Sequence, residues 1–186
     1  MRYEPCDVFI VHGRGWLGNS IRVLTRRPGE PPTRASHVGL MVRAGSAGQA
    51  YAVEALSHVR HAPFSKHLGE VVAVYRPLNL LDADKAAICA RAFSYVGKGY
   101  GYLKIAAHAA DWLLGGAYVF RRLAIMDNYP ICSWLVAHSY KAAGKHFGVP
   151  DGAASPDDID DFVRRNPDKY ECVWPLRKLT EEVPDA

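Results

Sequence analysis

Along the first part of the chain, short apolar runs alternate with turn-forming residues, a pattern typical of β-strands. Glycines and a serine between the second and third runs predict a tight connection around residues 45–48. The prolines of residues 27–34 predict a loop, because proline can neither continue a helix nor donate a hydrogen bond in a central strand. We predict strands over residues 7–11, 37–42, 50–55 and 71–76.

The later part of the chain changes to the three- and four-residue spacing of apolar positions that is typical of helices. Ser155 and Pro156, followed by two aspartates, are a strong helix start, because they supply a cap, a fitting first residue and negative charge for the helix dipole. Strands that precede helices indicate an α+β fold. We predict helices over residues 20–26, 82–96, 103–114 and 132–144, a further helix from Ser155, and an edge strand over residues 170–174.

The length of 186 residues suits one domain, over residues 1–186, that can bury a core without disulfides. The formal net charge of +4 is spread among interspersed acids and bases, and without a clustered basic stripe we expect no nucleic-acid partner. The apolar stretch at residues 102–120 is interrupted by Lys104, His108 and Asp111, so we predict no transmembrane segment.

Four cysteines, Cys6, Cys89, Cys132 and Cys172, are widely spaced and form no C-x-x-C motif. This pattern fits a reduced protein. The N-terminus has no basic leader followed by an apolar run, which argues against a Sec signal peptide. We therefore predict a cytoplasmic location, with export by another route left open.

Cys132 is the cysteine with a candidate chemical role. Pro130 marks a helix boundary and apolar residues follow at helical spacing, so Cys132 is expected at or just inside a helix N-terminus. The helix dipole and the free N–H groups there favour a thiolate, and the same N–H groups could stabilise an oxyanion. The alternative is a buried cysteine with a purely structural role.

A thiol nucleophile needs a base, and the base needs a residue that orients it. If residues 37–42 and 50–55 form a hairpin that turns at 44–47, His37 pairs directly with Glu54 on one face of the sheet. The small residues of that face would leave room for a helix end that carries the cysteine. A slip of one residue would separate the pair, and a His–Glu pair without chemistry is the alternative.

Four segments, ASHVGLMV, AVEAL, VGKGYGYLKI and YPICSWLVAHSY, occur in an order that resembles the permuted papain-like amidases of the NlpC superfamily, in the YiiX-like branch. The resemblance spans residues 7–144. It implies a papain-like fold, circularly permuted, with a mainly antiparallel sheet packed against helices. It also implies that Cys132 is the nucleophile, His37 the base and Glu54 the third member of a triad.

By the same resemblance, Tyr100, in a glycine-x-x-tyrosine segment, is expected to contact the substrate, as are Ser36 and Ser133 beside the base and the nucleophile. Relatives often have tyrosine directly before the cysteine and glutamate two residues after it, where this chain has Ile131 and Trp134. These departures bear on the identity of the substrate more than on the triad.

The reaction that the resemblance implies is hydrolysis of an amide bond in a cell-wall (peptidoglycan) peptide or a small acyl-amide. It would proceed through an acyl-enzyme, and we expect neither a cofactor nor a metal. A lipid hydrolase or acyltransferase on the same fold is one alternative, since papain-like relatives include lipid-acting enzymes. A ligand-binding protein whose triad is idle is the other.

Three further patterns carry weaker alternatives. Residues 13–18 match G-x-G-x-x-G, but the helix expected after them is too short for a dinucleotide fold, so a glycine-rich turn beside the cleft is favoured. His58, His61 and His67 lack the spacing of a zinc site, and we expect them on the surface or in loops. The arginines among residues 22–43 fit a solvated face, with a clamp for a substrate carboxylate or phosphate as the alternative.

Overall fold

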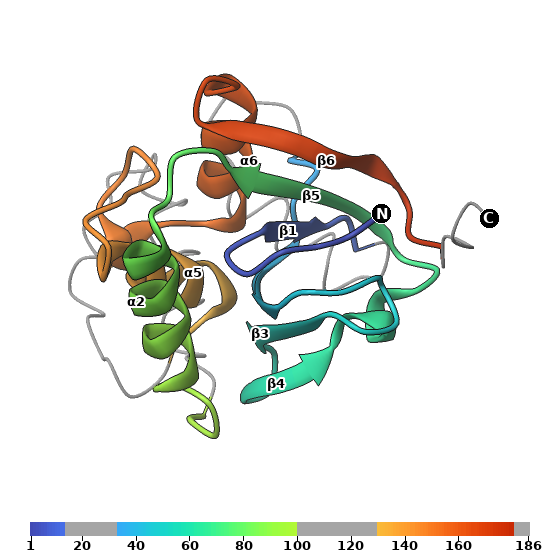
Figure 1. Cartoon of the computed structure of the whole chain (residues 1–186), viewed down its shortest axis with the longest axis horizontal. Helices are drawn as coiled ribbons and strands as arrows, with labels where there is room; N and C mark the ends of the chain where they lie inside the picture. The colour runs from blue at the N-terminus through green and yellow to red at the C-terminus, as the bar shows by residue number, and fades with distance from the viewer. Residues whose placement is uncertain (14–32, 100–129, 181–186) are drawn as a thin grey trace, which may run out of the picture.

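Residues 1–13, 33–99 and 130–180 of the 186-residue chain are described by this computed structural model (Figure 1). Within them, six strands form one sheet in the order β4-β3-β2-β1-β5-β6, and every neighbouring pair is antiparallel. The strands are β1 (Val8–Val11), β2 (His37–Arg43), β3 (Tyr51–Ala55), β4 (Val59–Pro63), β5 (Val71–Pro77) and β6 (Tyr170–Lys178). The helices among the described residues are α2 (Asp82–Phe93), α5 (Cys132–Lys141), α6 (Pro156–Arg165) and the 3-10 helices η1 (Phe64–His67) and η2 (Asp151–Ala153).

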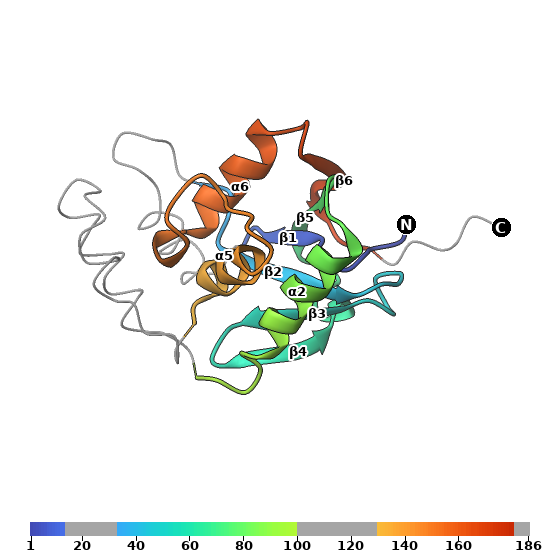
Figure 2. The same cartoon turned by 60° about the vertical axis from the view of Figure 1, so that its left-hand side comes forward.

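Both faces of the sheet are buried, each in a separate apolar cluster. On one face, strand residues such as Val38 and Leu40 pack with the apolar residues of α2 and α5. Figures 1 and 2 show these two helices next to one another on the same side of the sheet. On the other face, Phe9, Met41 and Trp174 belong to a second cluster. The predicted α+β architecture is confirmed, and its two buried faces follow from the alternation of apolar residues along each strand.

The element ends agree with the local sequence signals. The Ser155 hydroxyl accepts a hydrogen bond from the Asp158 N–H at 3.1 Å, which caps α6 as predicted. Helix α2 ends at Phe93, earlier than the predicted residue 96, because the chain turns before Gly97. Gly97 has a φ of 88°, a conformation that suits glycine, and its N–H donates to the Val59 carbonyl at 2.9 Å. Strand β6 lies at the sheet edge, as predicted for residues 170–174.

The predicted pairing of β2 with β3 is wrong in its register. Leu40 lies opposite Val53 and Met41 opposite Ala52, which displaces β3 by two residues from the register that would set His37 directly opposite Glu54. Side chains alternate between faces with a period of two, so this displacement keeps every predicted face and leaves Glu54 on the diagonal from His37. A bulge between Met41 and Arg43 accompanies the longer connection to β3.

The predicted reason for the small residues on this face is also wrong. A side chain at Gly39 would collide with the ring of Phe9, so the glycine makes room for an aromatic ring of the neighbouring strand. Helix α5 instead packs on the opposite face, among the residues around Val38. The first residue of α5, Cys132, therefore contacts His37 at the N-terminal end of β2, of which His37 is the first residue.

Several predicted features lie outside the described residues. They are the helices over residues 20–26 and 103–114, most of the loop over 27–34, the apolar stretch over 102–120, nearly all of the G-x-G-x-x-G segment, and Tyr100. Among the residues that the structure describes, none belongs to a helix long and apolar enough to cross a membrane.

Candidate functional site

His37 is held at the first position of β2 by the residue before it. The Ser36 hydroxyl donates to the Val11 carbonyl at 2.9 Å and accepts from the Gly13 N–H at 2.7 Å, which ties the start of β2 to the end of β1. The His37 side chain is 13% exposed, and its Nε2 lies 2.8 Å from Glu54 Oε2. This bond leaves Nδ1 as the ring nitrogen that can serve the thiol.

Cys132 opens helix α5 and is 4% exposed. Burial alone would raise the pKa of the thiol, but its hydrogen bond with His37 and the backbone groups of Val38 and Ser133 outweigh burial and lower that pKa below its ordinary value. The structure therefore brings Cys132 and His37 together. It also surrounds the sulfur with groups that stabilise a thiolate.

The same contacts act on the histidine in the opposite direction. Burial lowers the pKa of His37, but the hydrogen bonds with Cys132 and Glu54 raise it to about 10. A thiol with a lowered pKa beside an imidazole with a raised pKa favours a thiolate–imidazolium pair over a neutral thiol and imidazole. Such a pair holds a nucleophile already ionised and an acid that can protonate a leaving group.

Glu54 is almost completely buried and is anchored from strand β4. Arg60 lies directly opposite Glu54 in the β3–β4 pairing and donates two hydrogen bonds to Oε1, at 2.9 Å from Nε and 2.7 Å from Nη2. Burial would raise the pKa of Glu54, but His37 and His67 outweigh it and hold that pKa well below the usual range. The carboxylate is thus fixed in position and remains charged beside His37.

His67 is a second histidine at the site, and its predicted place on the surface or in a loop is wrong. It ends η1 with its side chain 7% exposed. Its Nε2 lies 3.2 Å from Glu54 Oε2, and its Nδ1 lies 2.6 Å from Glu70 Oε2. Burial lowers the pKa of His67, but the two carboxylates outweigh burial and raise it. His58 and His61 are exposed, as predicted.

These side chains form a line of alternating charge that runs from the buried thiol to the surface. The order is Cys132, His37, Glu54, His67 and Glu70, in which the pKa shifts favour a thiolate, two imidazolium cations and two carboxylates. Arg60 adds one cation at Glu54 and balances the total charge to zero. Opposite charges within hydrogen-bonding distance offset much of the cost of removing each from water.

An aromatic cluster closes one side of this line. The ring of Phe9 lies 5.0 Å from that of His67 and 6.1 Å from that of His37, centroid to centroid. Phe64 packs against both Phe9 and His67. Apolar rings here exclude water from the charged groups, which strengthens their mutual attraction.

The other residues singled out in the sequence lie in different settings. The Ser133 hydroxyl is buried and has no hydrogen-bond partner among residues 1–13, 33–99 and 130–180. Arg34 forms no part of a substrate clamp, because it binds Asp160 through Nε at 2.6 Å and Nη2 at 2.8 Å and donates to the Tyr75 hydroxyl. Arg43 lies over the Tyr51 ring, away from these groups.

Two site residues, Arg60 and His67, were missed by the sequence reasoning. A signal existed for Arg60, since a hairpin that turns at residues 56–58 sets it opposite Glu54. For His67 the signal was weaker: Glu70 follows three residues later and Phe64 precedes it by three, a spacing that fits one helical turn.

The donor atoms at this site do not fit a metal centre. Both oxygens of Glu54 are engaged, Oε1 by Arg60 and Oε2 by His37 and His67. A cation placed among these groups would face the positive charge of Arg60. In the part of the chain that the structure describes, no group of three His, Cys, Asp or Glu residues is arranged to hold an ion.

Comparisons with known proteins bear on the fold. No family model and no curated protein matches the chain. Among solved structures, the fold is similar to that of the metalloprotein YiiX from Escherichia coli O157:H7, with a TM-score of 0.56 and 16% sequence identity over 96% of this chain and 88% of that one. At this identity the likeness shows an α+β, papain-like fold of the YiiX kind, and the function has to be argued from the site.

Proposed function

We propose that the chain is a papain-like cysteine amidase or peptidase that cleaves an amide bond through Cys132, His37 and Glu54. The observation that carries this proposal is the hydrogen bond between Cys132 and His37, whose ring is held on its other side by Glu54. Together with the backbone groups of Val38 and Ser133, these contacts outweigh burial and favour the charged forms of the thiol and the imidazole. Perturbed pKa values of this kind gather where catalysis needs them. We infer that the substrate is a cell-wall peptide or a small acyl-amide, in keeping with the resemblance to NlpC-type amidases.

In the first half of the reaction, the Cys132 thiolate attacks the carbonyl carbon of the amide. The C–N bond then breaks, and the proton held by His37 passes to the leaving amine, so that an acyl-enzyme and a neutral imidazole remain. The N–H groups at the start of α5 supply hydrogen-bond donors for the oxyanion of the tetrahedral intermediate.

In the second half, neutral His37 takes a proton from water, and the resulting hydroxide attacks the acyl carbon. The C–S bond breaks, the carboxylic acid leaves, and the thiolate–imidazolium pair is restored. Glu54 holds the imidazole ring in place and stabilises its charged form. Arg60 and His67 act through Glu54 and are positioning residues.

The resemblance to NlpC-type amidases assigns substrate recognition to three residues, Tyr100, Ser36 and Ser133. The Ser36 hydroxyl is hydrogen-bonded to Val11, the last residue of β1, and to Gly13, which follows that strand. We therefore infer that Ser36 serves the site by fixing the position of His37. All four cysteines are free thiols, which is consistent with the cytoplasmic location that we infer.

The experiment that tests the proposal is mass spectrometry of the intact protein after exposure to a library of acyl probes with amide, peptide and lipid-ester scaffolds. We expect one acyl adduct, on Cys132, with turnover of amide or peptide probes. Cys132→Ala should remove the adduct, and Cys172→Ala, at an exposed thiol, should leave it unchanged. A chelator should not reduce turnover, because the proposed chemistry uses no Lewis acid.

Each outcome has a defined meaning. An adduct formed only from lipid esters would replace the amidase with a lipid hydrolase or acyltransferase. A protein that binds probes without acylation at Cys132 would be a ligand-binding protein with an idle triad. Either result would overturn the proposal.

A further inference from the structure

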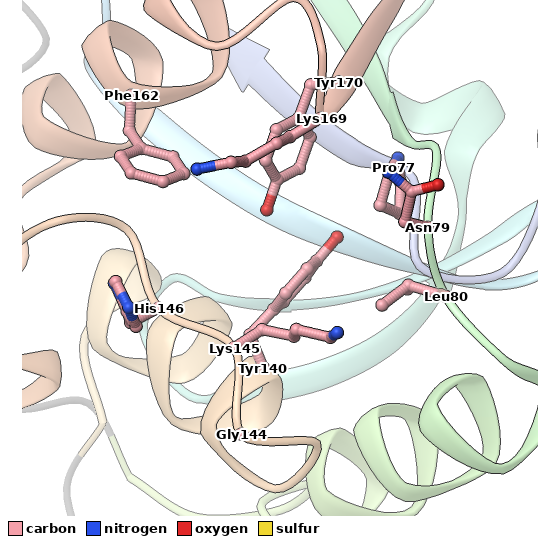
Figure 3. Close-up of a pocket in the computed structure, with 10 residues that line it drawn as sticks. All are labelled: Pro77, Asn79, Leu80, Tyr140, Gly144, Lys145, His146, Phe162, Lys169 and Tyr170. Atoms are coloured by element: carbon pink, nitrogen blue, oxygen red, sulfur yellow. The ribbon is translucent and has the colours of Figure 1, made fainter.

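A cavity lies at the other end of helix α5 from the Cys132 thiol. It has a volume of about 300 Å³ and is lined by residues of the β5–α2 connection, the end of α5, helix α6 and the start of β6 (Figure 3). Tyr140 lines it from α5, eight residues after Cys132. At 1.5 Å per helical residue, about 12 Å of helix separates the two positions along the axis. Cys132, His37 and Glu54 do not line this cavity.

The walls of the cavity are largely aromatic and apolar. The rings of Phe162 and Tyr170 lie 6.1 Å apart, centroid to centroid, and Leu80 and Pro77 complete the apolar lining. The Tyr140 hydroxyl donates to the Cys6 carbonyl at 2.6 Å, so that its proton is already committed. Apolar walls with a few polar groups are the usual composition of a small-molecule site.

The hydroxyl of Tyr170 is a polar group that faces the cavity. Tyr170 is 7% exposed, and the described residues give its hydroxyl no hydrogen bond. In Figure 3 the hydroxyls of Tyr170 and Tyr140 point toward one another across the cavity. Burial raises the pKa of Tyr170, so the hydroxyl keeps its proton at neutral pH and can donate it. A hydroxyl that opens into a cavity and is not used by the protein is available to a ligand acceptor.

Positive charge stands at the rim of the same cavity. Lys169 reaches over the Phe162 ring, with its Nζ 5.7 Å from the ring centroid (Figure 3). Lys145 has an acidic neighbour only at a long distance, with 3.9 Å between its Nζ and the Asp84 carboxylate. No aspartate, glutamate or arginine is among the residues that line the cavity. Two ammonium groups and one hydroxyl suit a monoanion, whereas phosphate recognition more often uses arginine forks or backbone N–H groups.

We propose that this cavity binds a small organic carboxylate with an apolar body, its oxygens on the Tyr170 hydroxyl and the Lys145 and Lys169 ammonium groups. The apolar body lies against Phe162 and Leu80. The site is separate from the catalytic groups and does not depend on the proposed amidase activity.

Titration of the ¹⁵N-labelled protein with phenylpropionate, followed by chemical shifts, tests this site. Phenylpropionamide, which has the same body without the charge, is the matched ligand control. We expect saturable binding of the carboxylate and at least roughly tenfold weaker binding of the amide, because hydrogen bonds to charged groups are the stronger class. Tyr170→Phe should also weaken binding of phenylpropionate about tenfold. It should leave the fold intact, because the hydroxyl makes no hydrogen bond with the described residues.

Three further variants locate the site. Lys169→Gln should weaken binding of phenylpropionate severalfold, and Lys141→Gln, an exposed lysine that pairs with Asp151 outside the cavity, should not. Cys132→Ala should bind phenylpropionate as the wild type does. Binding that disappears in Cys132→Ala, equal affinity for the acid and the amide, or no saturation at millimolar phenylpropionate would each overturn the proposal.

Discussion

Charge at the candidate site is arranged residue by residue so that each buried group has a partner of opposite sign. His37 lies between Cys132 and Glu54, and His67 lies between Glu54 and Glu70. An isolated ionisable group in such a setting would lose or gain a proton and become neutral instead of remaining charged. The pKa of each group therefore depends on its neighbours, and a substitution at one position must change the titration of the next.

This arrangement predicts a reactive thiol at Cys132. We expect Cys132 to alkylate with iodoacetamide at neutral pH much faster than Cys6 or Cys172, because the pKa is lowered at Cys132 and raised at the other two. Its rate should change less between about pH 6 and pH 8 than that of Cys172. Peptide mass spectrometry after timed labelling measures each site.

Cys89 is the competitor that this experiment must separate. Its pKa is also lowered, chiefly by a hydrogen bond with Cys6, whose sulfur lies 3.9 Å away. His37→Ala should slow the alkylation of Cys132 alone and leave Cys89 unchanged. Equal slowing at both thiols, or equal rates at all four in the wild type, would contradict a thiolate that depends on His37.

The contribution of His67 to stability should fall as the pH rises. The folded-state pKa of His67 lies above the unfolded value of about 6.5, so its ion pairs contribute fully below that pH and are lost as the pH passes the folded pKa. We expect His67→Gln to lower the free energy of unfolding by about 2 kcal/mol at pH 6 and by less at pH 10. Urea unfolding at both values measures this. His58→Gln, at an exposed histidine, should have no effect, and a loss for His67→Gln that grew with pH would refute the assignment.

At this scale the sequence indicated the three candidate catalytic residues, but it did not indicate the residues that hold them in place. Cys132, His37 and Glu54 stand out because their types, alternation and helix boundary each have a chemical meaning. The structure brings these three together. Arg60 and His67 were missed because their roles depend on a β3–β4 hairpin and a short 3-10 turn, which leave little periodic signal.

At the scale of elements, the face of the sheet on which a residue lies is easier to predict than the register in which two strands pair. Alternation along β2 and β3 assigns each residue to a face, and any even displacement keeps that assignment, so the two-residue error in pairing left the predicted faces intact. Strand β4 was not predicted, because an edge strand of five residues that ends in proline resembles a loop. The face of the sheet that α5 covers could not be predicted, because both faces are apolar and each is buried in its own cluster.

The close approach of Phe9 to Gly39 connects sheet packing with the site. We expect Gly39→Ala to lower the free energy of unfolding by about 1–3 kcal/mol, because the new methyl group must displace the Phe9 ring. Since Phe9 also packs on His37 and His67, the variant should in addition lose activity. Thermal unfolding and probe turnover measure the two effects. Gly152→Ala, at a glycine with open space around it, is the control and should change neither.

At the scale of the whole molecule, the fold joins residues that are distant along the chain. His37, Glu54 and Cys132 come from β2, β3 and α5, and the pairing of β2 with β3 brings the first two together near the first residue of the helix. A similar fold occurs in YiiX at 16% identity, because layered packing depends on the pattern of apolar positions more than on the residues themselves. The catalytic proposal therefore depends on whether these three residues act as one unit.

A double-mutant cycle on turnover tests that unit. Cys132→Ala and His37→Ala should each reduce turnover of an amide substrate by about a thousandfold or more, since each removes a group that the whole reaction needs. Glu54→Gln should cost less, roughly one to two orders of magnitude, because the amide can still hold the imidazole but cannot stabilise its charge.

The combination of His37→Ala with Glu54→Gln decides the matter. Glu54 contacts the reaction only through His37, so the double variant should turn over little more slowly than His37→Ala alone. Circular dichroism must show that each variant is folded, since Glu54→Gln also weakens the contacts with Arg60 and His67. If the two losses multiplied in folded protein, Glu54 would act independently of His37, and another group would have to orient the base.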